Sequence, residues 1–160
     1  MNRMFVALRA AVFGAAFVWF WGRAALSMRR FDGLIAVPLP EWVAVAGGVL
    51  FACGAIVAAA CISLFVVRGH GTPAPFDAPR AFVAVGPYTV IRNPMYAGGW
   101  LMLVGLGLIE RSVAMLAFSL AWLSLAHLFV ALYEERTLAT RFGASYHDYR
   151  RRVPRWIPGI

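Results

Sequence analysis

The chain has 160 residues, of which 62% are hydrophobic and 14% are charged, and its mean hydropathy is +0.73. This composition lies far outside that of soluble domains, so we expect a single all-α integral membrane domain over residues 1–160. The formal net charge of +8 rests on fifteen arginines. In so apolar a chain basic residues set topology and meet anionic lipids, so we expect membrane lipids, and no nucleic acid, as partners.

Four hydrophobic runs follow one another, at about 4–21, 42–67, 95–109 and 112–133. A helix needs ~20 apolar residues to cross the hydrocarbon core, so the second and fourth runs are long enough. The first contains Arg9 and the third is short. We expect all four to be transmembrane helices.

The first run has an alternative interpretation as a secretory signal, because Arg3 precedes it and Ala24-Ala25 follows it. Three bulky aromatic residues at 19–21 argue against a cleavage site and suit an interfacial belt. A retained span is favoured. In the second run, Cys53 and Cys61 are roughly 12 Å apart along a helix, too far for a disulfide and without metal-ligand spacing.

Arginines are distributed unevenly between the two ends of these spans. One end receives eleven of them: Arg3, Arg9, Arg68, Arg80, Arg92, Arg136, Arg141, Arg150, Arg151, Arg152 and Arg155. The other end receives four: Arg23, Arg29, Arg30 and Arg111. The positive-inside rule therefore predicts that both termini and the Gly86 segment face the cytoplasm, in an inner membrane of the bacterial type.

The segment 68–93 is rich in proline and glycine, which excludes a continuous helix. Short β-compatible pieces at 81–85 and 88–91 flank Gly86-Pro87 and predict a small hairpin or an extended turn. Irregular backbone is tolerated in a membrane protein only where it is wet or buried in protein, so we place this segment at the interface. Residues 69–80 have the composition of a shaped lid.

At Asn93-Pro94 the signals for a helix start agree, because Asn is a good N-cap and Pro suits the first helical position. The start of this helix offers free N–H groups and a positive dipole end to an anion. Gly105 and Gly107 indicate helix packing, whereas Gly98 and Gly99 suit close approach of either a helix or a ligand.

The turn at 110–112 is so short that the third and fourth helices must form an antiparallel hairpin, which brings Asn93 next to Glu134. His127 precedes Glu134 by seven residues, so both are predicted on one helix face. His127 is a functional candidate or a neutral histidine bonded to a neighbouring helix.

After Glu135 the helix is expected to end at Gly143, and Ser145 to open a further helix. Its aromatic face and its arginines predict an interfacial helix on the membrane surface, ended by Pro154 and anchored by Trp156.

Together these motifs appear in a characteristic order: Gly86-Pro87-Tyr88, Arg92-Asn93-Pro94-Met95-Tyr96, a hydrophobic hairpin, Glu134-Glu135-x-x-Leu138, Phe142-Gly143, Tyr146-x-x-Tyr149 and Pro154. The ordered set resembles the isoprenylcysteine carboxyl methyltransferase and phospholipid methyltransferase superfamily, from about Thr72 onward. The first two runs carry none of these motifs. The family's Arg-His-Pro-x-Tyr motif corresponds to Arg92, Asn93, Pro94 and Tyr96, with Asn93 in place of histidine, and its paired glutamates correspond to Glu134 and Glu135.

The resemblance implies two N-terminal spans in 1–67 and a methyltransferase-like core in 68–160. It implies that the core binds S-adenosylmethionine at the cytoplasmic end of the hairpin. The acceptor would be a lipophilic substrate from the bilayer, an isoprenylcysteine-type carboxylate or a phospholipid amine. Glu135 is predicted to lie nearest the chemistry, and Arg92 to orient an anionic substrate or the cofactor carboxylate. The candidates for binding the cofactor are Tyr88, Asn93, Pro94, Tyr96, Gly98, Gly99, His127, Tyr133, Glu134 and Glu135.

Two other interpretations stay open. Within enzymes, the acceptor could be a thiol or another small lipophilic molecule. Outside enzymes, the chain could be a small transporter or an interaction protein, although a coupled carrier should pair ionisable groups inside its spans and here His127 is the internal one. No obligate protein partner is expected.

Overall fold

The computed structural model describes residues 3–35, 37–69 and 82–159, which form helices and turns without a strand. The elements in chain order are α1 (Arg3–Ser27), η1 (Met28–Phe31), α2 (Asp32–Ile35), α3 (Val43–Leu64), η2 (Phe65–Gly69), η4 (Gly86–Thr89), α4 (Pro94–Ile109), α5 (Val113–Phe129), η5 (Val130–Glu134) and α6 (Glu135–Arg152). The expected all-α fold is confirmed.

Three segments are long and apolar enough to cross a membrane: Phe5–Ile35, Val43–Arg68 and Val113–Arg152. The apolar helix α4 has 16 residues, which at ~1.5 Å per residue makes it shorter than the ~30 Å hydrocarbon core. At least one end of α4 therefore lies inside the hydrocarbon region if the helix is oriented across the membrane. Polar residues placed there are close to lipid.

Glycines hold α3 and α4 in close antiparallel contact. A Cβ added at Gly47 would lie 2.7 Å from the carbonyl oxygen of Gly105, and one added at Gly54 would lie 2.5 Å from that of Gly98. On each helix the two glycines are seven residues apart, so they repeat on one face. Small residues let membrane helices approach to backbone contact, which confirms the packing role predicted for Gly105.

The predicted hairpin of α4 and α5 is present, and its turn has an unusual residue. The N–H of Ser112 donates to the carbonyl of Gly107 at 2.9 Å, and that of Arg111 donates to the carbonyl of Leu108 at 3.1 Å. This is the Schellman pattern, in which glycine normally takes the left-handed position. Here Arg111 takes it, with φ of 51°.

The start of α5 is capped by two side chains. The Ser112 hydroxyl accepts from the N–H of Met115 at 3.1 Å, and Asp32 accepts from the N–H of Ala114 at 2.9 Å. Because Asp32 opens α2, this contact ties the connection between α1 and α3 to the hairpin. A carboxylate at a helix N-terminus also complements the helix dipole.

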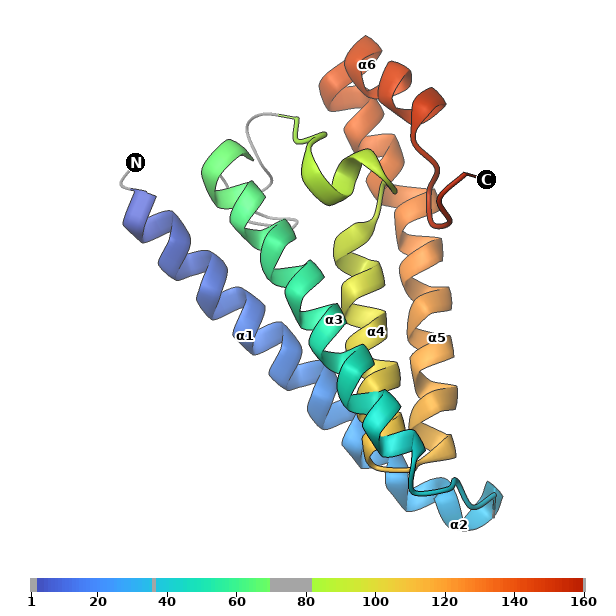
Figure 1. The fold of residues 1–160 in the computed structure, drawn as a ribbon. Helices are drawn as coiled ribbons and strands as arrows, with labels where there is room; N and C mark the ends of the chain where they lie inside the picture. Colours follow the sequence, from blue (N-terminus) through green and yellow to red (C-terminus); the bar gives the residue numbers. More distant parts are fainter. Residues whose placement is uncertain (1–2, 36, 70–81, 160) are drawn as a thin grey trace.

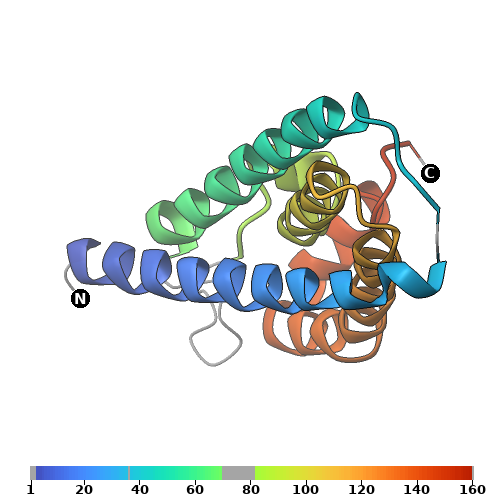
Figure 2. The ribbon, with the colours of Figure 1, turned by 90° about the horizontal axis from the view of Figure 1, so that it is seen from below.

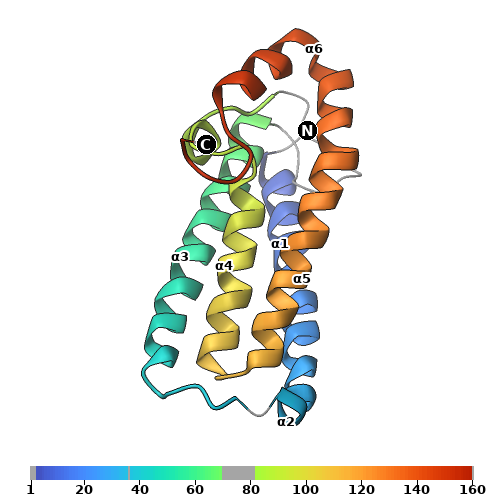
Figure 3. The same ribbon diagram turned by 90° about the vertical axis from the view of Figure 1, so that its right-hand side faces the viewer.

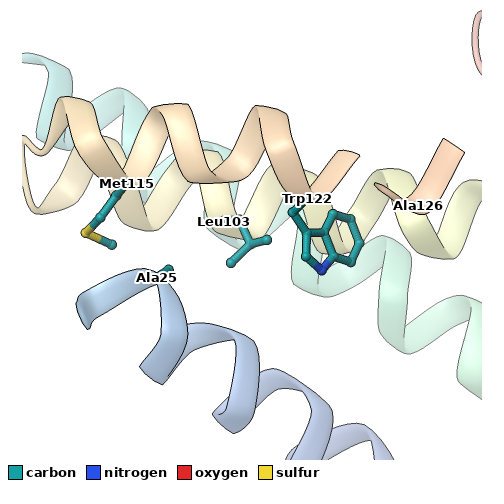
Figure 4. Packing of buried hydrophobic residues seen from close by; sticks show 5 residues of the cluster. All are labelled: Ala25, Leu103, Met115, Trp122 and Ala126. Atoms are coloured by element: carbon teal, nitrogen blue, oxygen red, sulfur yellow. The ribbon is translucent and has the colours of Figure 1, made fainter. Parts of the chain in front are cut away.

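Both termini lie at one end of the bundle, together with α6 and the segment 82–93, while α2 and the α4–α5 turn lie at the other (Figure 1). This agrees with the arrangement expected from the arginine distribution. Seen from below, α1 crosses the bundle obliquely, with its N-terminal half extending away from the α4–α5 hairpin (Figure 2). Its C-terminal half joins the core cluster of Ala25, Leu103, Met115, Trp122 and Ala126 (Figure 4).

The β-hairpin predicted around Gly86-Pro87 is wrong for the described part of that segment, residues 82–91, which contains no strand. Residues Gly86–Thr89 form the 3₁₀ turn η4, with φ of 60° at Gly86. Within it the Thr89 hydroxyl donates to the carbonyl of Gly86 at 2.8 Å. Val83 and Tyr88 are buried beside Cys61 of α3, so packing against a helix takes the place of strand pairing.

Candidate active site at the end of the hairpin

The site lies where the start of α4 meets the end of α5, as the sequence predicted. Between α5 and α6 the chain widens into the π-helical turn η5, in which the N–H of Glu135 donates to the carbonyl of Val130. Such a turn inserts one extra residue and rotates everything after it by about 100° relative to an uninterrupted α-helix. Isolated π-helical turns are frequent at functional sites.

An arginine, glutamate and arginine cluster joins the three segments that meet here. Nη1 of Arg92 lies 2.9 Å from Oε1 of Glu135. Arg155 grips the same carboxylate with two hydrogen bonds, from Nε to Oε1 at 2.8 Å and from Nη2 to Oε2 at 2.9 Å. The side chain of Glu135 is 7% exposed and that of Arg92 is 11% exposed. A forked guanidinium holding a buried carboxylate is a strong and directional contact.

The hydrogen bonds with Glu135 raise the pKa of Arg155 above its usual value, so the arginine stays charged. Arg92 is less completely paired than Arg155. Among the described residues, its buried Nε and Nη1 find no hydrogen-bond acceptor, because the ion pair with Glu135 lacks hydrogen-bond geometry. Buried donors without an acceptor are rare in folded proteins, and a catalytic or binding role is one of the explanations for them.

The C-terminal tail after α6 folds back onto the start of α4 (Figure 3). The N–H of Arg92 donates to the carbonyl of Pro154 at 2.8 Å, and Nδ2 of Asn93 donates to the carbonyl of Arg155 at 3.2 Å. The Asn93 side chain makes no capping bond to α4. Asn93 is therefore the N-cap residue by position, as predicted, while its amide serves the tail instead of the helix. Pro94 occupies the first helical position, as predicted.

Beside this cluster, Tyr96 pairs with Glu134, the other glutamate of the predicted site. Its hydroxyl donates to Oε2 of Glu134 at 2.8 Å. The ring of Trp156, in the tail, stands edge-on to Tyr96 with ring centroids 6.5 Å apart. The indole N–H of Trp156 donates to Nδ1 of His127 at 2.9 Å. The tail thus covers the Tyr96–Glu134 pair from the side of α5.

Comparison with known proteins identifies the family of the chain. Residues 42–145, about two thirds of the chain, match the phospholipid methyltransferase family. The chain belongs to this family. The match confirms the resemblance and begins earlier than expected, because it includes α3, which carries none of the quoted motifs. Arg92, Asn93, Tyr96 and the two glutamates lie inside the matched range.

Three curated proteins are similar to parts of the chain. Methanethiol S-methyltransferase 2 of Bradyrhizobium diazoefficiens is 40% identical over 74 residues, 46% of this chain and 27% of that protein. The nickel-cobalt-cadmium resistance protein NccN of Alcaligenes xylosoxydans xylosoxydans is 32% identical over 78 residues, 49% of this chain and 36% of its own. The cobalt-zinc-cadmium resistance protein CzcN of Cupriavidus metallidurans is 32% identical over 81 residues, 51% and 37% respectively. The matched segments thus span between 27% and 37% of these relatives.

Several predicted site residues of this phospholipid methyltransferase family member lie elsewhere. Gly98 faces α3, where an added Cβ would lie 2.9 Å from the carbonyl oxygen of Gly54, so helix packing explains it. Gly99 faces Trp122 instead, at 3.4 Å from an added Cβ. Tyr133 is exposed and packs against Phe129. We attribute the exposure of Tyr133 to the wide turn η5, because such a turn changes which side chains of the helix point inward.

His127 and Tyr88 also differ from expectation. His127 is exposed on α5, and its described hydrogen bond goes to the tail tryptophan and not to a neighbouring helix. Tyr88 is buried against α3, its ring 5.6 Å from that of Phe65, and burial raises the pKa of its phenol. Its carbonyl accepts from the hydroxyl of Tyr149 at 2.7 Å.

The predicted break at Gly143 is confirmed, since φ of 51° and ψ of −128° bend α6 there. The prediction that the helix after Gly143 lies on the membrane surface is wrong for its aromatic face. Tyr146 and Tyr149 are buried, and the Phe82 ring meets both of them edge-to-face, with ring centroids 5.9 and 5.0 Å apart. This face packs on the segment after residue 81 and not on lipid.

Sequence reasoning missed Arg155 and took Trp156 for a membrane anchor. Nothing in the local sequence distinguishes Arg155 from the run of arginines at 150–152. The one available signal was Pro154, which ends α6 and lets the chain reverse direction.

Proposed function

We propose that this protein is an S-adenosylmethionine-dependent methyltransferase acting on a lipophilic acceptor that arrives from the bilayer. The observation that carries the proposal is Arg92, a buried arginine with two donors that lack hydrogen-bond acceptors, beside the Tyr96–Glu134 pair. Membership of the phospholipid methyltransferase family supports the same activity.

The residues present suit the cofactor's chemical groups. S-Adenosylmethionine, when bound, supplies an electrophilic methyl group on a sulfonium. Arg92 would hold the carboxylate with its guanidinium, whose Nε has no hydrogen-bond acceptor among the described residues and whose Nη1 is ion-paired with Glu135. Glu134 would accept from the ammonium or the ribose hydroxyls, and the rings of Tyr96 and Trp156 offer faces to a cation or to adenine.

The sequence predicted that Glu135 lies nearest the chemistry. In this proposal it is a positioning residue instead. Both of its carboxylate oxygens are engaged by Arg155, and Arg92 lies against one of them. It holds Arg92 in place and binds the tail to the site. Methyl transfer is a direct displacement that depends chiefly on alignment, so fixing Arg92 contributes to the rate. Glu134 is the carboxylate available to hold a proton released by a thiol or an ammonium acceptor.

The acceptor belongs to one of two classes. A phospholipid amine or an isoprenylcysteine-type carboxylate fits the family as a whole. A small thiol is the second candidate, because a relative that is 40% identical over 74 residues is named a methanethiol S-methyltransferase. Mass spectrometry of methylated lipids and volatile thioethers, from cells with and without the protein, separates the two.

We place the site and both termini on the cytoplasmic side of a bacterial inner membrane. The excess of arginines at that end supports this orientation. A reporter fused to the C-terminus should be active in the cytoplasm. An external signal would reverse the orientation.

Cofactor binding is tested by titration calorimetry on the full chain in detergent, comparing Glu134→Gln with wild type. Glu110→Gln is the matched control, since Glu110 pairs with Arg29 at the opposite end of the bundle. We expect Glu134→Gln to weaken S-adenosylmethionine binding at least tenfold and Glu110→Gln to leave it unchanged. Equal affinity in all three proteins would remove Glu134 from the cofactor site, and absence of binding to wild type would overturn the proposed function.

A further inference from the structure

A small apolar cavity lies between α1 and the hairpin, inside the span region. Its volume is about 50 Å³, and carbon atoms make up nearly all of its lining. α1 contributes Phe17, Trp21 and Gly22, and the hairpin contributes Gly99 and Trp122. The cavity is partly open, on the surface of helices that the bilayer covers.

Two features of the cavity wall bear on its role. The family match begins at residue 42, so the wall formed by α1 lies outside it. Two of the lining residues are also glycines that leave space. A Cβ added at Gly22 would meet no atom within 4 Å, and Gly99 is separated from Trp122 by ordinary van der Waals distance for such a Cβ.

The cavity adjoins the candidate active site. Gly99 lies three residues, about one helical turn, after Tyr96 on α4. The Tyr96 ring is 6.4 Å from that of Trp122, which lines the cavity, and its hydroxyl bonds Glu134. The cavity thus lies one helical turn and one aromatic ring away from the Tyr96–Glu134 pair.

We propose that the cavity binds the alkyl chain of the methyl acceptor, that Gly22 and Gly99 leave the space for it, and that the size of this space limits the length of the chain. This rests on the proposed function. A carbon lining suits hydrocarbon and offers no partner to a polar group. At about 50 Å³ the cavity has room for a short alkyl segment. The acceptor is a compact molecule with one short chain, in contrast to a prenyl or a diacyl lipid.

Binding is measured by ¹⁹F NMR on the full chain labelled with 5-fluorotryptophan in nanodiscs, with butane-1-thiol and decane-1-thiol as probes. Butane-1-thiol should shift the Trp122 resonance saturably and leave that of Trp42, which is 70% exposed, unchanged. Gly22→Leu should weaken this binding at least tenfold. Gly48→Leu is the matched control, because Gly48 also meets no atom within 4 Å of an added Cβ and does not line the cavity.

If Gly22→Leu does not fold, Gly99→Ala replaces it, since its Cβ would lie 3.4 Å from Trp122 and narrow the cavity. Equal binding of butane-1-thiol by wild type and the folded variant would overturn the proposal. An equal Trp122 shift with decane-1-thiol would overturn the length limit.

Turnover connects the cavity to the acceptor. Among two-carbon and four-carbon alkyl thiols and amines, Gly22→Leu should lower kcat/KM for the four-carbon acceptor at least tenfold relative to the two-carbon one, with S-adenosylmethionine affinity unchanged. An unaltered preference in an active Gly22→Leu variant refutes the cavity's role alone. Absence of S-adenosylmethionine binding to wild type refutes the proposed function instead, and the two failures are thereby distinguished.

Discussion

Replacing Glu135 by glutamine removes the negative charge that Arg92 and Arg155 share, while keeping the size of the side chain. In the structure this charge is almost fully buried, and it is the point at which the segment before α4, the start of α6 and the tail are joined. The substitution should therefore loosen the tail and lower the free energy of unfolding. Arg155→Gln tests the same cluster from its more exposed side.

The two variants should differ in size of effect because their partners differ in exposure. Glu135→Gln leaves Arg92, which is 11% exposed, without its counter-charge. Removing one partner of a buried pair costs roughly 3–5 kcal/mol, and we expect about 3 kcal/mol here. Arg155 is 28% exposed, and Glu135 keeps Arg92 when Arg155 is lost. Its replacement should cost about 1 kcal/mol.

Unfolding in mixed micelles of dodecyl maltoside and SDS measures the global change, and hydrogen exchange measures the local one. The amide of Arg92, which donates to the carbonyl of Pro154, reports directly on the tail. Arg155→Gln should speed exchange at this amide about fivefold, as 1 kcal/mol requires. Arg151→Ala is the control, because Arg151 is 77% exposed and pairs with Asp148 on the surface.

A double-mutant cycle decides whether the contact itself matters. Additive effects of Glu135→Gln and Arg155→Gln would show that the two side chains do not interact energetically. Unchanged exchange at the Arg92 amide in both single variants would mean that the cluster does not hold the tail, and the positioning role of Glu135 would be refuted.

Two further substitutions test the packing and the hairpin turn. Gly54→Ala should destabilise the fold by about 2 kcal/mol, because its Cβ would lie 2.5 Å from a backbone oxygen of α4, whereas Gly48→Ala should be neutral or stabilising; equal stability of the two variants would contradict the close contact of α3 and α4. Arg111→Gly should stabilise the hairpin by about 0.5–1 kcal/mol, because φ of 51° suits glycine and the ion pair with Glu41 is exposed; a lower melting temperature would show that this ion pair outweighs the strain.

The site was predictable in its elements and only partly in its contacts. The sequence placed Arg92, Asn93 and Tyr96 at a helix start and the two glutamates at a helix end, and a three-residue turn required these ends to meet. It did not say which glutamate contacts which partner. Tyr96 bonds Glu134, and Glu135 binds the arginines. We attribute this difference between the two glutamates to the wide turn η5, which no residue pattern in 130–134 predicts.

The sequence by itself determined the membrane class, the apolar helices, the hairpin and the family. Each of these follows from local composition or from the order of short motifs, which are properties of the chain before it folds. Only the tertiary structure decided that the tail returns to the start of α4, that Arg155 shares a carboxylate with Arg92, and that α1 lines an apolar cavity beside Trp122. These contacts join residues far apart in the chain, and they depend on the angles at which helices cross and turn, which local patterns do not encode.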